Sequence, residues 1–251
     1  MNASPCPLLP QTVTVDFSDR TSADCADGYT VTIYEDTIDG VDWVLADIDR
    51  NDLTSPVTIK TSAKTNDITV YGSPCADVVN IESTLNMEGF IYVAAGDGDD
   101  TITVGTSSSG LDSIYQEVFL EGGGGTDSLF VTDAGSTLSK TDGFLGSGTI
   151  SGLMNSFNDT LDFSDLDYSQ FEVIDLTLSS TMTSVFEIRS TASLSETYLT
   201  SGSAPDTITI SDSQGYLEVD TGDEGTTTVN NVESPNEGDT IYLYGLGDNV
   251  E

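Results

Sequence analysis

Two segments rich in glycine and aspartate, 95–103 and 122–130, hold the residues of this sequence that are best suited to chemistry. Each segment places spaced glycines before an aspartate, which is Asp100 in the first and Asp127 in the second. Glycine adopts positive φ angles that turn backbone carbonyl oxygens inward, and the aspartate adds an anionic oxygen. A Ca²⁺ ion takes roughly six to eight such oxygens, which is more than one turn supplies. The two turns would therefore have to lie in adjacent parts of the fold.

Both segments resemble the G-G-x-G-x-D-x-U-x nonapeptide of the hemolysin-type calcium-binding (RTX) repeats, in which U is an apolar residue. Segment 122–130 fits every specified position, and segment 95–103 departs only at Ala95. The resemblance implies calcium as the cofactor, with carboxylate ligands from Asp100 and Asp127 and with glycine carbonyls beside them. The implied metal site comprises Gly96, Asp97, Gly98, Asp99, Asp100, Gly123, Gly125 and Asp127.

The resemblance covers only these two short segments. Repeats of the RTX family follow one another directly, whereas these two are separated and the other turns of the chain lack the glycine pattern. The sequence therefore favours a broader β-helix with few ions over a regular β-roll. Glycine and aspartate are also common in tight turns for reasons of backbone geometry alone, and this metal-free alternative stays open.

A five-residue pattern, D-x-U-x-U, recurs along the chain. Its two apolar positions alternate with mainly polar ones, and a period of two over five residues is typical of a half-buried strand. Successive copies begin 22 to 33 residues apart, which suits one coil of a repeat fold each. The copies are DVVNI from Asp77, DTITV from Asp100, DSLFV from Asp127, DTLDF from Asp159, SVFEI from Ser184, DTITI from Asp206 and DTIYL from Asp239.

These intervals predict an all-β fold, a parallel β-helix or β-solenoid with about 22–33 residues per coil. The copies should form parallel neighbouring strands of one sheet, with their apolar residues stacked into one continuous core. We expect a single domain over 1–251, in which residues 1–66 form the first coils or a cap and residues 67–251 form the repeat coils.

The charge of the chain limits its partners. Forty-three acidic residues oppose six basic ones, the formal net charge is -37, and histidine is absent. A nucleic acid or an anionic membrane would meet a negative surface without a basic patch, so neither is an expected partner. No apolar stretch is long enough to span a bilayer, so we expect no membrane insertion. Calcium ions are the expected partners instead.

The cysteines allow a disulfide as well as free thiols. Cys6, Cys25 and Cys75 are too few and too widely spaced for a thiolate metal site. A disulfide between Cys6 and Cys25 is favoured, and three buried free thiols are the alternative.

The sequence as a whole favours a calcium-stabilised structural or adhesive module, either extracellular or at a cell surface, and not an enzyme. Self-association into a homo-oligomer, filament or lattice is expected, because an open end of a solenoid exposes strand edges. A glycan or a surface protein is the further partner considered. The alternatives are a polysaccharide-active β-helix enzyme and an ice- or glycan-binding solenoid, the latter suggested by the pairs Thr101/Thr103 and Thr207/Thr209.

Overall fold

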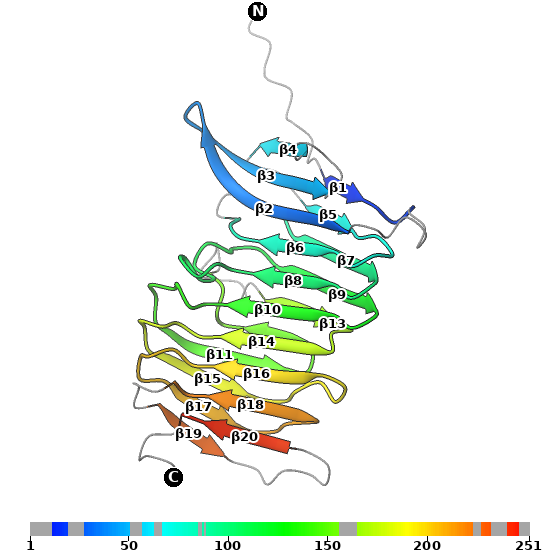
Figure 1. Cartoon of the computed structure of the whole chain (residues 1–251). Helices are drawn as coiled ribbons and strands as arrows, with labels where there is room; N and C mark the ends of the chain where they lie inside the picture. The colour runs from blue at the N-terminus through cyan, green and yellow to red at the C-terminus, as the bar shows by residue number, and fades with distance from the viewer. Residues whose placement is uncertain are drawn as a thin grey trace, which may run out of the picture.

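The structure is a computed structural model that describes residues 12–19, 28–50, 57–62, 67–84, 87, 89–155, 165–222, 227–231 and 240–245. All regular elements in these ranges are β-strands, which form two mostly parallel sheets, so the predicted all-β class is confirmed (Figure 1). None of the described ranges contains a helix that is long and apolar enough to cross a membrane.

The two sheets each contain ten strands in the described residues. Sheet A has the spatial order β1 (Val13–Asp16), β5 (Ile68–Tyr71), β7 (Ile91–Asp97), β9 (Val118–Gly124), β13 (Leu166–Ser169), β12 (Thr149–Ser151), β11 (Lys140–Gly146), β15 (Ser184–Ile188), β17 (Thr207–Ile210) and β19 (Thr228–Asn231). Sheet B has the order β20 (Thr240–Tyr244), β18 (Tyr216–Asp220), β16 (Glu196–Thr200), β14 (Val173–Thr177), β10 (Ser128–Thr132), β8 (Thr101–Val104), β6 (Val78–Ile81), β2 (Tyr29–Ile38), β3 (Val41–Arg50) and β4 (Val57–Ser62).

From β5 to β10 the chain alternates between the sheets, and each strand from β7 to β10 pairs in parallel with the strand two places earlier. We call one strand of sheet A and the following strand of sheet B a layer. The register places Val79, Ile102 and Leu129 opposite one another on β6, β8 and β10. Equivalent residues of successive layers therefore form columns, and the inward columns make up the core.

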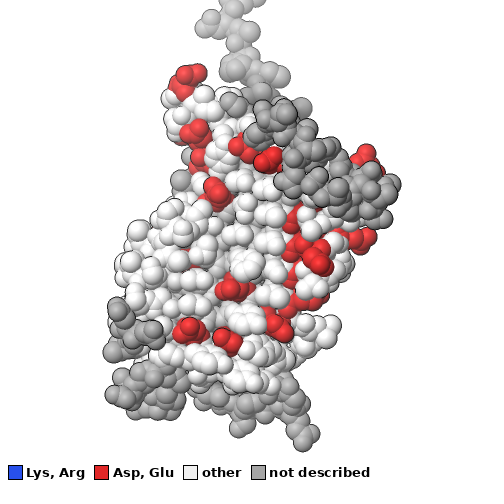
Figure 2. Space-filling view, viewed as in Figure 1, with Lys and Arg blue, Asp and Glu red and all other residues white. Residues whose placement is uncertain are grey.

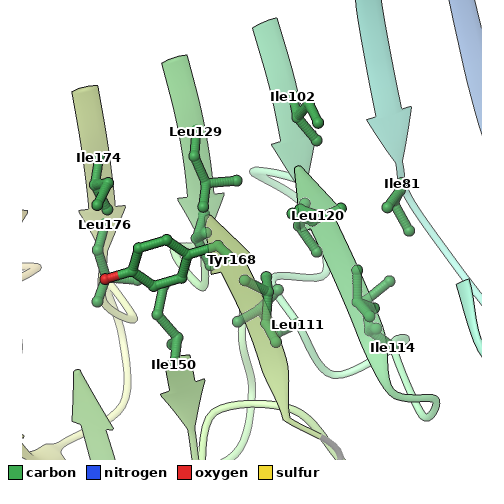
Figure 3. Packing of buried hydrophobic residues seen from close by; sticks show 14 of the residues in the cluster. Ile81, Ile102, Leu111, Ile114, Leu120, Leu129, Ile150, Tyr168, Ile174 and Leu176 are labelled. Carbon is green, nitrogen blue, oxygen red and sulfur yellow. The ribbon is translucent and has the colours of Figure 1, made fainter. Parts of the chain in front are cut away.

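The core contains the apolar residues that the repeated pattern predicts. In the five copies whose strands are β6, β8, β10, β15 and β17, both apolar positions are at most 2% exposed. Figure 3 shows Ile81, Ile102 and Leu129 side by side on neighbouring strands, with Leu111, Leu120 and Tyr168 packed close by. The last copy differs, because Ile241 and Leu243 of β20 are only partly buried.

The prediction that all copies lie in one sheet is wrong. The copies at β6, β8, β10 and β20 belong to sheet B, whereas those at β15 and β17 belong to sheet A. The copy at Asp159 lies outside the described residues. After β10 the chain adds three strands to sheet A, with β12 antiparallel to both β11 and β13, before it returns to sheet B at β14. These additional strands shift the alternation, so the copies at β15 and β17 fall in sheet A.

The first described strands extend both sheets. Strand β1 pairs in parallel with β5, and β2 pairs in parallel with β6. Strands β3 and β4 then add to sheet B in antiparallel order, so the region predicted as first coils or a cap is not built of parallel strands alone.

Cys75 is disulfide-bonded. The chain has only three cysteines, so a bond to Cys75 leaves Cys6 and Cys25 unable to pair with each other. The pairing that the sequence favoured is therefore wrong.

Two buried aspartates lie in the turns that lead from sheet B to sheet A. Asp133 accepts a hydrogen bond from the Leu111 N–H at 2.9 Å, and Asp206 accepts one from the Ser184 N–H at 2.6 Å. The second oxygen of each carboxylate is buried without a partner. Burial raises the pKa of Asp133 to about 7, although Lys140 lies nearby, and it raises the pKa of Asp206 to about 6.

We expect the metal-free protein to lose stability as the pH rises from about 4 to about 7. Folded Asp133 and Asp206 retain protons at pH values where the unfolded chain has released them, so the folded state binds more protons in this range. Each unit of pKa shift corresponds to about 1.4 kcal/mol, so the loss should exceed about 1 kcal/mol. Denaturation at several pH values measures it. Asp133→Asn with Asp206→Asn should reduce this loss without removing it, because Asp100 and Asp127 also have raised pKa values. An unchanged profile would contradict the assignment.

Replacing Ile102 by alanine should lower the free energy of unfolding by about 3 kcal/mol, because the side chain is fully buried in the core. Its neighbour Thr103 points outward on the same strand and is a matched control, for which alanine should cost less than about 1 kcal/mol. Urea denaturation gives both values. Equal losses would mean that the inward and outward faces of β8 are wrongly assigned.

Candidate functional site

The two glycine-rich turns lie side by side in adjacent layers. Strands β7 and β9 stay paired into the turns, with Gly96 opposite Gly123 and Asp97 opposite Gly124. The Gly98 N–H donates to the Gly124 carbonyl oxygen at 2.7 Å. The segments that the sequence singled out are thus direct neighbours in space.

Glycine is required where the turns touch. Gly123 and Gly125 have φ angles of 113° and 142°, which side-chain-bearing residues rarely adopt. A Cβ atom would lie 1.9 Å from the Gly96 carbonyl oxygen at Gly123, and 1.8 Å from the Gly98 carbonyl oxygen at Gly125. Only glycine permits this approach, and it brings carbonyl oxygens of one turn against the backbone of the next.

A carboxylate ladder runs across the start of the sheet B strands. Its members are Asp77, Asp100, Asp127 and Glu172, one from each layer. Each accepts a hydrogen bond from a backbone N–H of the preceding layer. The pairs are Tyr29 N to Asp77 Oδ1 at 2.7 Å, Asp77 N to Asp100 Oδ1 at 2.7 Å, Asp100 N to Asp127 Oδ1 at 2.8 Å, and Asp127 N to Glu172 Oε2 at 2.8 Å.

The ladder aspartates differ in whether the second oxygen of the carboxylate has a hydrogen-bond partner. Asp77 Oδ2 accepts from the Ser73 N–H at 2.6 Å and from the Ser73 hydroxyl at 2.9 Å. Asp100 Oδ2 and Asp127 Oδ2 are buried without a hydrogen-bond partner, in residues that are 1% and 0% exposed. The glycines that stack in the Ser73 column, Gly96 and Gly123, have no side chain to donate.

Electrostatics make these two carboxylates costly to ionise. Burial is the main cause that raises the pKa of Asp100 to about 7, and the neighbouring carboxylates of Asp77, Asp127 and Asp99 add to it, against a backbone hydrogen bond that lowers it. Burial also raises the pKa of Asp127, with repulsion from Glu172 and Asp99. Two buried anionic oxygens in adjacent layers can therefore be stabilised by a bound cation or by protons.

The other predicted acidic ligands lie on the surface of the turns. Asp97 and Asp99 are exposed, and Asp99 Oδ1 accepts the Thr126 N–H at 2.9 Å. Asp97 lines an open groove of about 660 Å³ together with Gly96, Gly123 and Gly124. Figure 2 shows acidic side chains gathered along the edge where β7 and β9 end.

The described side chains alone do not complete a metal shell. No group of three or more His, Cys, Asp or Glu side chains suitable for a metal occurs in the described ranges. Asp100 and Asp127 supply two buried carboxylates, so the remaining oxygens would have to come from the backbone of the glycine turns or from solvent. In such a shell the backbone carbonyl oxygens of the glycine turns would serve as ligands beside the two carboxylates.

Sequence reasoning missed Glu172 as a ladder member. The residues Glu172-Val173-Ile174-Asp175-Leu176 follow the repeated pattern with glutamate in place of aspartate, and Ile174 and Leu176 are fully buried. The search for aspartate favoured the copy at Asp159 as the next in line. A pattern that allowed aspartate or glutamate at its first position would have identified Glu172 and the strand that follows it.

No protein-family model, curated protein or solved structure matches the chain. The resemblance to RTX repeats therefore rests on two short segments. Function has to be inferred from the geometry of the carboxylate ladder and from the charge of the surface.

Replacing Gly123 by alanine should destabilise the protein by at least about 2 kcal/mol more than Gly40→Ala does. Both glycines have positive φ angles, 113° and 75°, so each variant pays the backbone strain of about 1–2 kcal/mol. Only Gly123 adds a clash with the next turn, since a Cβ atom at Gly40 meets nothing within 4 Å. Thermal unfolding in chelator compares the two. Equal losses would contradict the close stacking of the turns.

Proposed function

We propose that this chain is a calcium-stabilised β-solenoid that serves as a structural or adhesive module, extracellular or at a cell surface, and not as an enzyme. The observation that carries the proposal is the pair of buried, unpartnered carboxylate oxygens, Asp100 Oδ2 and Asp127 Oδ2, in two stacked glycine turns.

The pairing of the layers supports a solenoid. Strands of both sheets pair in parallel with their counterparts one layer away from β5 to β10, and again from β14 to β20. Each layer contacts mainly its neighbours, and the inward columns form a core that runs through all layers. The antiparallel strand β12 and the N-terminal strands β3 and β4 would be additions to this plan.

The donor set favours calcium among cations. Oxygen is the only ligand type that the glycine turns offer, through the carboxylates of Asp100 and Asp127 and the carbonyls of neighbouring glycines. Ca²⁺ accepts many oxygens in an irregular shell, whereas Mg²⁺ demands a tighter octahedral one. The exposed Asp97 and Asp99 would attract the ion to the turns. A bound cation would remove the cost of the buried charges at Asp100 and Asp127.

Composition and the disulfide support a location outside the cell. Disulfide bonds such as that of Cys75 persist mainly in oxidising compartments. The net charge of -37 also opposes compaction unless cations screen or bind it. An extracellular location would supply both the oxidising conditions that preserve a disulfide and the calcium that offsets the negative charge.

Two observations weigh against the alternative functions. The threonine pairs suggestive of ice binding lie in different sheets, since Thr101 and Thr103 belong to β8 and Thr207 and Thr209 belong to β17. The ladder acids hold the backbone together, a structural use of carboxylates that leaves them poorly placed for polysaccharide hydrolysis. Self-association into a filament or lattice stays a prediction.

Calcium should raise the melting temperature of the protein, and a chelator should lower it. An ion bound only by the folded state adds about 2.7 kcal/mol at a hundredfold excess over its Kd. Calorimetry with calcium, magnesium or chelator measures the shift, which we expect for calcium and only weakly for magnesium. A melting temperature that responds equally to both ions would indicate general charge screening.

Matched variants locate the ion. Asp100→Asn with Asp127→Asn should abolish the calcium-dependent shift, because it removes both buried carboxylates. Asp97→Asn with Asp99→Asn removes the same charge from the exposed surface of the turns and should retain most of the shift. If the first pair keeps the full shift, or only the second pair loses it, the site is not between Asp100 and Asp127.

A further inference from the structure

A strip of four tyrosines lies on the outer face of sheet B, away from the glycine turns. Tyr198, Tyr216, Tyr242 and Tyr244 come from β16, β18 and β20, and successive ring centroids are 5.6, 5.4 and 6.3 Å apart. Tyr242 and Tyr244 are 44% and 48% exposed. We call these residues the tyrosine strip. It is a continuous aromatic surface that crosses β16, β18 and β20 and then continues along β20 to Tyr244.

Each ring of the tyrosine strip has a carboxylate beside it. The Tyr198 hydroxyl donates to Glu196 at 2.9 Å, and the Tyr216 hydroxyl donates to Glu218 at 2.5 Å. The register places Tyr242 opposite Glu218 and Tyr244 opposite Asp220. A further carboxylate, Asp175 of β14, stands opposite Tyr198. The surface thus combines exposed π faces with negative charge.

No basic side chain of the described residues balances this charge. Strands β14, β16, β18 and β20 contain no Lys or Arg. Figure 2 shows acidic and uncharged side chains but no basic ones on the described surface in view, where these strands lie in Figure 1. Arg50 and Lys60 belong to β3 and β4, at the opposite end of the sheet.

Sheet A contains the same combination with its cation in place. Phe144 of β11 lies opposite Glu187 of β15. Arg189 stacks on the Phe144 ring at 3.7 Å from its centroid, and its Nε atom pairs with Glu187 Oε2 at 2.8 Å. A guanidinium group therefore satisfies an aromatic ring and a carboxylate together in this fold. The tyrosine strip repeats the ring and the carboxylate without the arginine.

We propose that the tyrosine strip and its carboxylates bind an arginine-rich, extended segment of another protein. Guanidinium groups stack on aromatic faces and form paired hydrogen bonds with carboxylates, so they match both components of this surface. A second copy of this chain is a poor partner, because it carries only six basic residues and a net charge of -37. A neutral glycan could stack on the rings but would leave the negative charge unmatched.

The inference rests on the proposed adhesive role, for which it names the chemistry of the partner. It does not depend on calcium binding at Asp100 and Asp127. Peptide binding at the tyrosine strip and calcium-dependent melting are separate measurements, so either can fail while the other succeeds.

Binding of a fluorescent peptide with arginine at every second position tests the proposal, with fluorescence anisotropy as the measurement. A peptide of the same length with citrulline in place of arginine is the matched control for charge, and a neutral β-glucan oligosaccharide represents the alternative ligand class. We expect the arginine peptide to bind and the other two to bind at least about fivefold more weakly, since they lack the cation–π contacts.

Variants of the protein locate the peptide. Tyr216→Leu with Tyr242→Leu, and separately Glu196→Gln with Glu218→Gln, should each weaken binding by about fivefold or more. Tyr71→Leu on sheet A and Asp36→Asn with Asp42→Asn in the β2–β3 hairpin are the matched controls and should bind as the unaltered protein does. Circular dichroism checks that all variants fold.

Three results would overturn the proposal. The arginine peptide could fail to bind, it could bind equally to the strip variants and the control variants, or the oligosaccharide could bind at the strip in its place. The second result would indicate attraction to the general negative charge of the protein, and the third would identify the strip as a glycan site.

Discussion

Backbone N–H groups where the layers meet need an acceptor, and along one edge of this protein that acceptor is a carboxylate of the next layer, buried in the three aspartates and half-buried in Glu172. The N–H groups of Tyr29, Asp77, Asp100 and Asp127 are all satisfied in this way. An unpaired buried N–H would cost about 1–3 kcal/mol per layer. The ladder therefore fixes one layer against the next, and the inward columns follow from that register. The same arrangement obliges the protein to bury acidic groups in a chain that already carries a net charge of -37.

The residues around each ladder carboxylate determine whether hydrogen bonds offset the free-energy cost of burying it. Ser73 donates twice to the second oxygen of Asp77, so this residue needs nothing further. Gly96 and Gly123 stack in the same column and have no hydroxyl to donate, and the second oxygens of Asp100 and Asp127 are buried without a hydrogen-bond partner. Glycine thus has two linked effects: it allows the turns to approach closely, and it provides no hydroxyl for the second oxygen of the aspartate four residues later. We propose that a calcium ion balances this pair of buried carboxylates, which lie in two adjacent layers.

The sequence predicted the local features of the fold well, because alternation of apolar and polar residues reports directly which side chains face inward. Ile102, Leu129 and Phe186 are buried as expected. The same pattern does not report which sheet a strand joins, so the shift that β12 introduces was not predictable from it. The adjacency of the two glycine turns follows from their equivalent positions in the pattern. Glu172 was missed because glutamate performs the hydrogen bond that the pattern had assigned to aspartate.

The position of the ion is the central claim, and anomalous X-ray diffraction from crystals grown with calcium tests it most directly. The account predicts a calcium peak between the two glycine turns, with carboxylate oxygens of Asp100 and Asp127 at about 2.3–2.6 Å from the ion. A well-ordered structure in saturating calcium that has no peak there would contradict the account. In that case Asp100 and Asp127 would be protonated or bound to water, and the glycine turns would serve backbone packing alone.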